Sequence, residues 1–330
     1  MVEHGGGVLA AARKHGHAPE RWLDLSTSIS PFGWPVGEIP PAVWQRLPEH
    51  EDGLLEFARA HYGAPYLAAA AGSQAVIGVL PELRPRGSVA VVVPTYAEHA
   101  AAWARAGHTV WETDARDVSA LVNRIDALVV CNPNNPTGDR LPRETLLAWN
   151  ARLAARGSWL VVDEAFADAD PSQSVAAGCG RTGLVVLRSP GKFFGLAGMR
   201  LGFALGWPEL VAALAERLGP WPVSGPARWI GREALADRVW QATARERLTA
   251  ASIRLAELLG AHGLAAAGRT ALFAWVPTAR AAALQAFLAE RAILVRAFPR
   301  LAGVRFGLPG APADWERLDA ALTAWRNVGA

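Results

Sequence analysis

The sequence contains few of the residues that support metal or disulfide chemistry. Its 330 residues include only two cysteines, Cys131 and Cys179, and these are not spaced as paired metal ligands are. So small a number excludes a disulfide-stabilised scaffold and is typical of a reducing compartment. We therefore predict no metal site.

Lysine is also rare. The 33 basic residues (Lys plus Arg) comprise Lys14, Lys192 and 31 arginines, a bias that codon usage explains. Any reaction that requires a lysine amine therefore has two candidates.

Long apolar runs and long basic runs are both missing. No apolar segment reaches the length of a membrane span. The first residues, MVEHGGGVLAAARKHG, do not show the charged start and apolar core of a secretory signal. The formal net charge is only +3, without a basic cluster that would favour nucleic acid. We expect a cytoplasmic protein that binds neither nucleic acid nor membrane.

Short apolar runs alternate with helical segments through much of the chain, and 51% of the residues are hydrophobic. We expect strands at 88–94, 108–113, 126–133, 158–166, 183–190 and 201–206, and helices at 53–62, 72–83, 97–107 and 143–157. This order predicts an α/β fold with a parallel or mixed sheet that helices cover on both faces. Ligands of such sheets bind at the carboxyl ends of the strands.

The pattern changes after residue 208. Two helices, at 208–218 and roughly 225–260, precede a strand at 270–277, a helix at 278–291, strands at 293–298 and 303–308, and a last helix at 313–326. We expect a large domain at 34–228 and a smaller α/β domain at 229–330, with which the arm 1–33 packs.

Lys192 lies between two expected strands, in the glycine-rich segment SPGKFFGLAGMRLG. A lone lysine in a loop is usually a solvated surface residue. Phe193 and Phe194 beside it would instead desolvate the amine, which weakens its preference for the charged form and makes it nucleophilic. Arg200 follows eight residues later. Taken alone, this segment leaves both readings open.

Polar residues follow several of the other expected strands. Asp163 ends a strand in VVDEAF, where a carboxylate could cap a helix, bind a metal or pair with the ring nitrogen of pyridoxal 5′-phosphate (PLP). Asn135 lies in the loop CNPNNPTG, which is a turn on composition alone. Tyr96 could stack on an aromatic ring or belong to the core. Ser73 and Gln74 begin a helix whose N–H groups could face a phosphate, a weak signal by itself.

Together and in this order, GSQ, PTY, NPNNPTG, VVDEAF and S-x-x-K-x-x-x-L-A-G-x-R-x-G resemble the class I/II aminotransferase family of fold-type I PLP enzymes. The resemblance covers essentially the whole chain. It implies a mostly parallel seven-stranded sheet in the large domain and PLP as cofactor. It also implies that Lys192 holds PLP as a Schiff base, Asp163 holds the pyridine nitrogen, Asn135 contacts the 3′-oxygen and Tyr96 stacks on the ring. The residues that it assigns to the cofactor phosphate are Ser73, Gln74, Ser189 and Arg200.

Two branches of the family are most similar, the histidinol-phosphate aminotransferases and the L-threonine O-3-phosphate decarboxylases of cobalamin biosynthesis. The opening EHGGGVLAAARKHG, the stretch DLSTSISPFGWP and Phe166, where aminotransferases usually have Tyr, favour the decarboxylase branch. In that branch, residues that match His4, Arg296 and Arg305 face the substrate, and an arginine fork suits a carboxylate better than a lysine does. His4 has an alternative interpretation as part of a disordered terminus.

Some positions depart from the branch pattern. Ser28 and Ser30 replace residues that are commonly Asn, and Leu47 replaces a Tyr that in many relatives crosses the dimer interface to the cofactor phosphate. These differences weaken the transfer of substrate contacts and leave the set of cofactor residues complete.

The resemblance predicts decarboxylation of a small phosphorylated amino acid, L-threonine O-3-phosphate, to (R)-1-aminopropan-2-ol phosphate by a homodimer. The alternative reaction is transamination of a histidinol-phosphate type, since the bond on Cα that is perpendicular to the cofactor ring is the one that breaks. A catalytically silent PLP-binding module is a rival of another class, although the retained Lys192 argues against it. A nicotinamide dehydrogenase is disfavoured further, because no G-x-G-x-x-G follows the first strand.

Overall fold

The computed structural model describes residues 4–328, which form two compact units. The large unit consists of Gly33–Asn135 and Arg140–Ala242. The small unit consists of Pro136–Asp139 and the described parts of Met1–Phe32 and Thr243–Ala330. The predicted domain limits, 34–228 and 1–33 with 229–330, stay a prediction.

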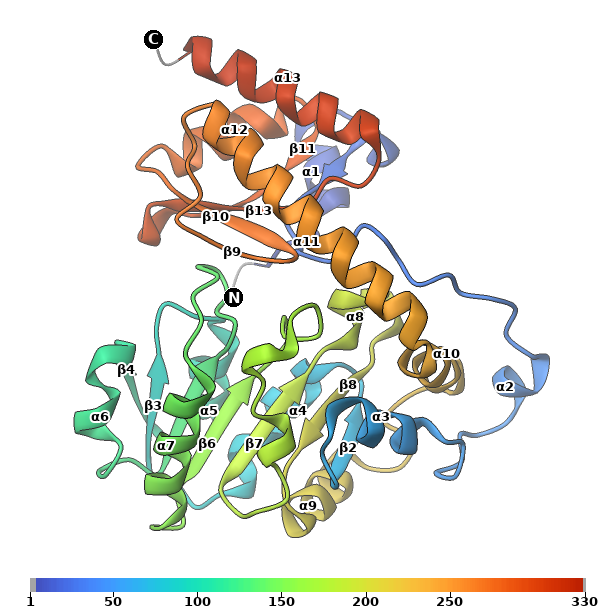
Figure 1. The fold of residues 1–330 in the computed structure, drawn as a ribbon, viewed down its shortest axis with the longest axis vertical. Coiled ribbons are helices and arrows are strands. Elements are labelled where there is room, and N and C mark those ends of the chain that lie inside the picture. The colour runs from blue at the N-terminus through green and yellow to red at the C-terminus, as the bar shows by residue number, and fades with distance from the viewer. Residues whose placement is uncertain (1–3, 329–330) are drawn as a thin grey trace. The chain divides into compact units, whose positions relative to one another are not determined.

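The large unit is built on a seven-stranded sheet (Figure 1). In spatial order its strands are β2 (Leu67–Ala70), β8 (Gly202–Leu205), β7 (Leu184–Arg188), β6 (Trp159–Asp163), β5 (Ala127–Cys131), β3 (Ser88–Val92) and β4 (Thr109–Thr113). Six of the strands run in one direction, and only β8 is antiparallel to its two neighbours. The predicted α/β fold with a mostly parallel seven-stranded sheet is therefore confirmed.

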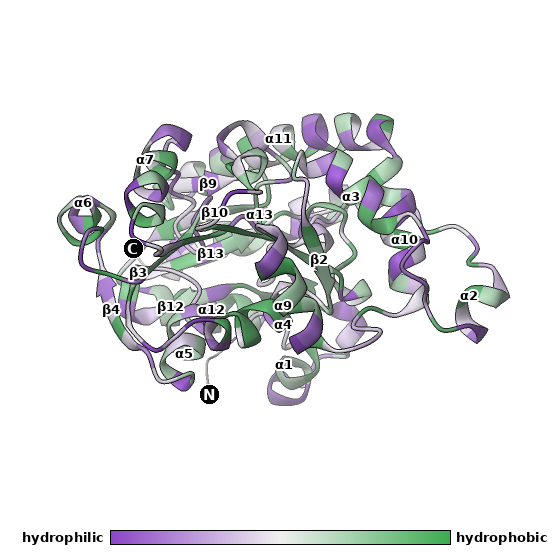
Figure 2. Cartoon of the chain, turned by 90° about the horizontal axis from the view of Figure 1, so that it is seen from below, coloured by the Kyte–Doolittle hydropathy of each residue, from purple (hydrophilic) through white to green (hydrophobic). Residues whose placement is uncertain are grey.

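The central strands are apolar because both of their faces are covered. Every residue of β5, β6 and β7 is buried, which explains why these strands have continuous runs of Val and Leu without alternating polar residues. Figure 2 shows β2 and β3 in the hydrophobic colour, whereas the helices carry both colours. On one face, the strand residues Val129 and Val161 pack in a core with Trp103 and Leu210 from the helices.

The large unit also contains helices, most of which pack around this sheet. They are α2 (Pro41–Gln45), α3 (Leu54–Tyr62), α4 (Ser73–Val79), α5 (Glu98–Arg105), α6 (Val118–Leu121), α7 (Arg143–Ala154), α8 (Pro190–Phe193), α9 (Pro208–Leu218) and α10 (Gly225–Ala236). Glycine ends α3, since Gly63 adopts the left-handed conformation that favours glycine at this position. α11 (Arg238–Ala261) begins in the large unit and continues in the small unit.

The small unit contains a four-stranded antiparallel sheet in the order β12 (Arg296–Phe298), β13 (Gly303–Gly307), β10 (Phe273–Pro277) and β9 (Gly268–Thr270). A separate parallel pair joins β1 (Leu23–Asp24) to β11 (Ile293–Leu294). The helices of this unit are α1 (Val8–His15), most of α11, α12 (Ala281–Ala289) and α13 (Pro312–Val328). Through this pair the described part of the N-terminal arm, up to Phe32, belongs to the small unit.

Two expected elements differ in the structure. The helix expected at roughly 225–260 is divided, because Asp237 leaves the helical conformation and its Oδ1 accepts a hydrogen bond from the Trp240 N–H (3.0 Å), as a residue that caps the next helix does. The strand expected at 293–298 is also divided, with β11 and β12 in different sheets. No helix within residues 4–328 is long and apolar enough to cross a membrane.

Candidate active site

The carboxyl ends of the central strands bring the candidate cofactor residues of the large unit to one edge of the sheet. Asp163, the last residue of β6, pairs in register with Cys131 on β5 and with Leu187 on β7. The segment after β7 carries Ser189 and Lys192. Parallel pairing of neighbouring strands therefore places these side chains near one another, as the sequence predicts.

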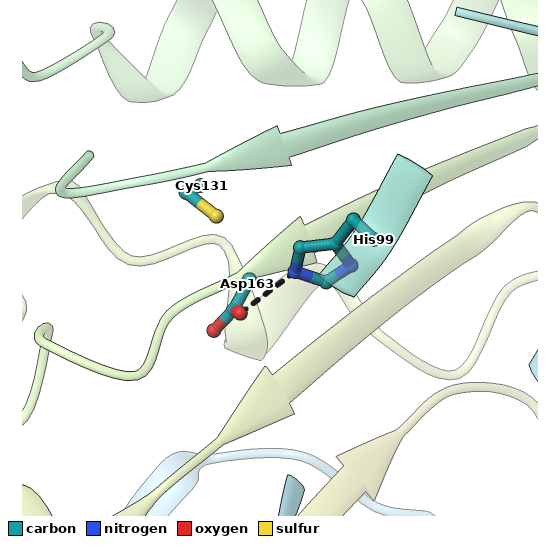
Figure 3. A group of neighbouring side chains, drawn as sticks. All are labelled: His99, Cys131 and Asp163. Atoms are coloured by element: carbon teal, nitrogen blue, oxygen red, sulfur yellow. Dashed lines mark hydrogen bonds and ion pairs between the residues drawn. The ribbon is translucent and has the colours of Figure 1, made fainter. Parts of the chain in front are cut away.

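The Asp163 carboxylate is buried, with 5% of the residue exposed, and it is held from two sides. Its Oδ1 accepts a hydrogen bond from the Ala165 N–H (3.0 Å), and its Oδ2 lies 2.8 Å from Nε2 of His99 on α5 (Figure 3). These two contacts fix the position of the carboxylate at the strand end.

His99 is a site residue that the sequence interpretation missed. Burial alone would lower its pKa, but the nearby Cys131 and the Asp163 carboxylate raise that pKa to about 10. At neutral pH the His99 imidazole is therefore protonated and can donate to the Asp163 carboxylate. The available signal is the spacing in PTYAEH, where His99 follows Tyr96 by three residues and the two rings meet edge to face at 6.0 Å.

His99, Cys131 and Asp163 also form a group with ligand atoms that all lie within 4.8 Å of one another. Figure 3 shows the three side chains facing one region from α5, β5 and β6. Such a group could hold a metal ion, although the hydrogen bond between His99 and Asp163 already uses two of its ligand atoms.

Tyr96 and Gln74 are joined directly. The Tyr96 hydroxyl donates to Oε1 of Gln74 (2.9 Å), and the Gln74 amide donates to Oε2 of Glu98 (3.3 Å). Burial, Glu98 and Asp163 raise the pKa of Tyr96 to about 12, so the phenol is neutral at ordinary pH. The ring is held in place beside His99, where it can pack against a flat ligand.

Three of the predicted phosphate-binding residues gather around Gly72. The hydroxyl oxygens of Ser73 and Ser189 lie 2.7 Å apart. A Cβ atom at Gly72, where φ is +79°, would lie 2.5 Å from Nη2 of Arg200, so only glycine allows the guanidinium this close. Two hydroxyls and a guanidinium form a donor set that suits a phosphate.

Lys192 lies on α8, which its neighbours hold in place. A Cβ atom at Gly191 would come within 3.0 Å of the Ala197 Cα, so glycine allows this turn to fold tightly. Phe193 is fully buried, and Phe194 stacks on Trp240 with the ring centroids 5.3 Å apart. The Lys192 Nζ lies 5.8 Å from the centroid of the buried Phe166 ring, in agreement with the predicted apolar surroundings of the amine.

Asn135 lies half-buried in the loop after β5. Two hydrogen bonds between Asn132 and the backbone of Leu141, at 2.8 and 3.1 Å, brace this loop. The Asn134 amide donates to the carbonyl of Pro94 (2.8 Å), in the segment that leads to Tyr96. Asn135 therefore lies next to a residue tied to the Tyr96 segment.

In the small unit, Arg305 and the segment that follows His4 both contact Ser26. The Gly6 N–H donates to Oγ of Ser26 (2.8 Å), and the buried Arg305 donates from Nη2 to the Ser26 carbonyl (2.5 Å). A Cβ atom at Gly5 would lie only 2.4 Å from that carbonyl oxygen, so the segment after His4 requires glycine there. His4 itself is exposed.

Arg296 and Arg305 lie opposite each other on the antiparallel strands β12 and β13. Burial and the neighbouring Arg296 lower the pKa of Arg305 to about 9, and Asp24 opposes this shift. Like charges on directly paired residues destabilise a sheet. An anionic ligand would relieve that repulsion, which supports the prediction that these arginines bind an anion.

The predicted site residues thus divide into two sets according to the unit that contains them. The cofactor set, all in the large unit, consists of Ser73, Gln74, Tyr96, Asn135, Asp163, Ser189, Lys192 and Arg200. The substrate set, all in the small unit, consists of His4, Arg296 and Arg305.

Residues 44–322 match the model of a protein family described as aminotransferase class I and II. The chain is 52% identical, over 327 residues and 99% of each chain, to a threonine-phosphate decarboxylase from Pseudomonas aeruginosa. It is 42% identical to a threonine-phosphate decarboxylase from Sinorhizobium sp, with 97% of each chain covered.

The fold is shared with solved structures. One is a histidinol-phosphate aminotransferase from Sinorhizobium meliloti in complex with pyridoxal-5′-phosphate, which superimposes with a TM-score of 0.80. The two chains are 21% identical, and the alignment covers 98% of this chain and 95% of the other. At this identity the likeness shows the fold.

Proposed function

Since this chain belongs to the aminotransferase class I and II family, we propose that it is a PLP-dependent lyase that decarboxylates L-threonine O-3-phosphate. The product is (R)-1-aminopropan-2-ol phosphate, and the reaction belongs to cobalamin biosynthesis. The observation that carries the proposal is the similarity over almost the full length to two proteins of that name.

The residues of the large unit fit the cofactor. A buried carboxylate, two hydroxyls 2.7 Å apart with a guanidinium beside a required glycine, and a lysine amine facing an apolar ring match the three polar parts of PLP: the ring nitrogen, the phosphate and the aldehyde. When bound, PLP is an electron sink that accepts the electron pair released at the substrate Cα.

Asp163 holds a proton on the ring nitrogen, and the hydrogen bond with His99 fixes its carboxylate in position. Ser73, Gln74, Ser189 and Arg200 hold the phosphate, Asn135 donates to the 3′-oxygen, and Tyr96 packs on the ring. Lys192 carries the covalent link, and its amine is also the group that can return a proton to Cα after carbon dioxide has left.

The substrate set binds the two anionic ends of the substrate. Arg305 is buried and planar, and it holds the carboxylate, while Arg296 and His4 face the phosphate. Charge-assisted hydrogen bonds from arginine to phosphate or carboxylate are among the strongest available to a protein. A doubly anionic substrate therefore suits these residues better than free threonine does.

Phe166 separates this site from a standard aminotransferase site. Its ring is buried and faces Lys192, and it offers no hydroxyl to the 3′-oxygen. Aminotransferases usually have Tyr at this position, so Phe166 supports decarboxylation over transamination by a histidinol-phosphate type of reaction. The complete set of cofactor residues argues against a silent module.

We also propose that the enzyme is a cytoplasmic homodimer. Support for the dimer comes from the large exposed apolar side chains Trp44, Leu47 and Trp221, which are 66%, 64% and 54% exposed. Apolar side chains of this size are often covered in an assembly. An active species that sediments as a monomer at micromolar concentration would contradict the dimer.

The test of the function is a direct comparison of two reactions in one preparation of the enzyme. With L-threonine O-3-phosphate alone, we expect carbon dioxide and an aminopropanol phosphate, without any keto acid. With histidinol phosphate and 2-oxoglutarate, we expect little glutamate. Efficient amino transfer without release of carbon dioxide would establish the alternative reaction instead.

A further inference from the structure

A cluster of buried charged side chains lies beside the cofactor residues and has no part in the chemistry described so far. Its members are Glu164, Asp168 and Arg188, which are 0%, 1% and 3% exposed. His61 and Tyr62 of α3 complete this group, which we call the buried ionic cluster. All five residues belong to the large unit.

Arg188 is the centre of the cluster. Its Nη1 lies 3.0 Å from Oε2 of Glu164, and its Nη2 lies 3.8 Å from Oδ1 of Asp168. The guanidinium also lies over the Tyr62 ring, 4.6 Å from the ring centroid. The same Asp168 oxygen is 3.8 Å from Nε2 of His61. One arginine therefore joins the strand end of β7, the loop after β6 and helix α3.

Glu164 is held firmly on its other side. Its Oε2 accepts a hydrogen bond from the Ser174 hydroxyl (2.7 Å), and its Oε1 accepts one from the Val175 N–H (2.7 Å). Burial raises the pKa of Glu164, and Arg188 and these donors oppose that shift. The carboxylate is thus ordered by three separate contacts.

The cluster and the cofactor residues lie on opposite faces of the same two strand ends. Asp163 and Glu164 are consecutive, so their side chains point to opposite faces, and the same holds for Arg188 and Ser189. The Glu164 N–H donates to the Leu187 carbonyl (2.9 Å), which continues the pairing of β6 with β7 beyond Asp163. Asp163 reaches His99 on one face while Glu164 reaches Arg188 on the other.

Stability alone is a weak explanation for this cluster. Burying charges costs free energy that their attraction often does not recover, and apolar residues of similar volume frequently serve as well. Within residues 4–328, the Tyr62 hydroxyl and both Nε and Nη1 of Arg188 are buried without a hydrogen-bond partner, which adds to that cost. The contact of Nη1 with Glu164 is therefore an ion pair without hydrogen-bond geometry. Buried polar groups of this kind are retained in some proteins because they specify one arrangement.

We propose that Glu164 and Arg188 are positioning residues that lock the ends of β6 and β7 against each other. The ion pair fixes the distance between Asp163, which holds the ring nitrogen, and Ser189, which holds the phosphate. The pyridine ring of PLP is rigid and the arm that carries its phosphate is short, so PLP affinity depends on that distance. The inference rests on the proposed function only in that it requires PLP as the cofactor. It does not depend on which substrate the enzyme uses.

The test compares cofactor affinity with stability in matched variants. Glu164→Gln keeps the size of the side chain and removes its charge. Leu184→Ala is the control, since Leu184 is fully buried at the other end of β7 and far along the strand from Ser189. For each protein, the dissociation constant of PLP is measured by titration of the apoenzyme, and the melting temperature is measured without PLP.

We expect Glu164→Gln to weaken PLP binding about 10- to 100-fold, as the loss of a supporting contact does at other ligand sites. We expect Leu184→Ala to lower the melting temperature at least as much and to change PLP affinity less than threefold. Equal loss of affinity in both variants at equal loss of stability would overturn the inference. Wild-type affinity in Glu164→Gln would overturn it as well.

Two milder variants keep the inference testable if Glu164→Gln does not fold. Ser174→Ala removes one hydrogen bond to Glu164, and Asp168→Asn removes the more distant charge near Arg188. We expect a smaller loss of PLP affinity in each, with a shifted absorption band of the bound cofactor. Unchanged affinity and spectrum in both would reject the positioning role.

Failure of the proposed function gives a different result. If the wild-type enzyme binds PLP but forms no carbon dioxide, the proposed function is wrong and the inference about Glu164 and Arg188 still holds.

Discussion

The cofactor set and the substrate set are held by very different structures. Asp163 ends β6 and Ser189 follows β7, and both of these five-residue strands are buried along their whole length in a seven-stranded sheet. Side-chain contacts hold these strand ends on both faces, through His99 on one and through Glu164 and Arg188 on the other. Arg296 begins a three-residue strand, and His4 is an exposed residue on an arm that hydrogen-bonds through Gly6. The fold thus holds the residues proposed for the cofactor on buried strand ends, whereas two of the three residues proposed for the substrate lie on a short strand or an exposed arm.

The largest effect is expected from Lys192→Ala, which removes the only nucleophilic amine of the cofactor set. Turnover should fall by roughly 10³-fold or more, as it does when a covalent catalyst is deleted. The visible band that borohydride abolishes in the wild type should disappear. Lys14→Ala, the other lysine variant, should keep both activity and the reducible band. A reducible adduct in Lys192→Ala would contradict the assignment.

A strong pH dependence is expected from His99, which holds the cofactor set on the helix side. Its pKa is raised from 6.5 to about 10, so the imidazolium is favoured in the folded apoenzyme by Asp163 and Cys131. This stabilisation is fully present below pH 6.5 and is lost as the pH rises towards 10. Its contribution to the free energy of unfolding is on the order of a few kcal/mol.

The measurement is the urea midpoint of the apoenzyme between pH 6 and pH 10. This interval runs from just below the ordinary pKa of histidine, 6.5, to the raised pKa of His99, about 10. The wild type should lose stability through this interval, and His99→Asn should lose much less because residue 99 no longer titrates. Tyr96, with a pKa of about 12, titrates above the interval and does not confuse the comparison. Parallel curves for the two proteins would show that His99 is not protonated.

In the substrate set, Arg305→Lys should act on the substrate without affecting the cofactor. A lysine keeps the charge but cannot form the planar two-bond contact, and it loses the hydrogen bond to the Ser26 carbonyl. We expect KM for L-threonine O-3-phosphate to rise about 10- to 100-fold. The absorption spectrum of bound PLP should stay the same. A changed spectrum with an unchanged KM would show that Arg305 acts on the cofactor and not on the substrate.

The sequence predicted the parts of the site that strong local patterns carry. Apolar runs that end in Asp163 or Cys131 identify buried parallel strands, and the edge of the sheet then follows from their topology. Composition alone limited the choice of a catalytic lysine to two residues, Lys14 and Lys192. The short strand β2 was missed because LAAA has no β-branched residue and pairs only with β8.

Contacts between segments that are distant in the sequence could not be predicted from local patterns. His99 follows a helix start, and nothing local shows that its ring reaches a carboxylate 64 residues later. Glu164 was overlooked because DEAF was interpreted only through Asp163 and Phe166. The break at Asp237 had a visible signal, since Asp is a favoured capping residue, but the continuous Ala/Leu/Arg pattern around it concealed the boundary.

The smallest effect, and the sharpest test of how the substrate set is held, is expected from Gly5→Ala. The added Cβ would lie 2.4 Å from the Ser26 carbonyl oxygen, a distance that forces the arm to shift. The same oxygen accepts the hydrogen bond from Arg305, so the shift should disturb His4 and Arg305 together. We expect KM for L-threonine O-3-phosphate to rise about three- to tenfold, the loss of roughly 1 kcal/mol.

The matched control is Gly7→Ala, two residues further along the same arm. A Cβ atom there has no atom within 4 Å, and the φ angle of −80° suits any residue. The two variants add the same methyl group, so a difference between them isolates the contact with Ser26. PLP affinity should be unchanged in both, because the arm belongs to the small unit and the cofactor set to the large unit. Equal KM values for the two variants would mean that the arm does not position the substrate residues, and His4 would then have no role in binding.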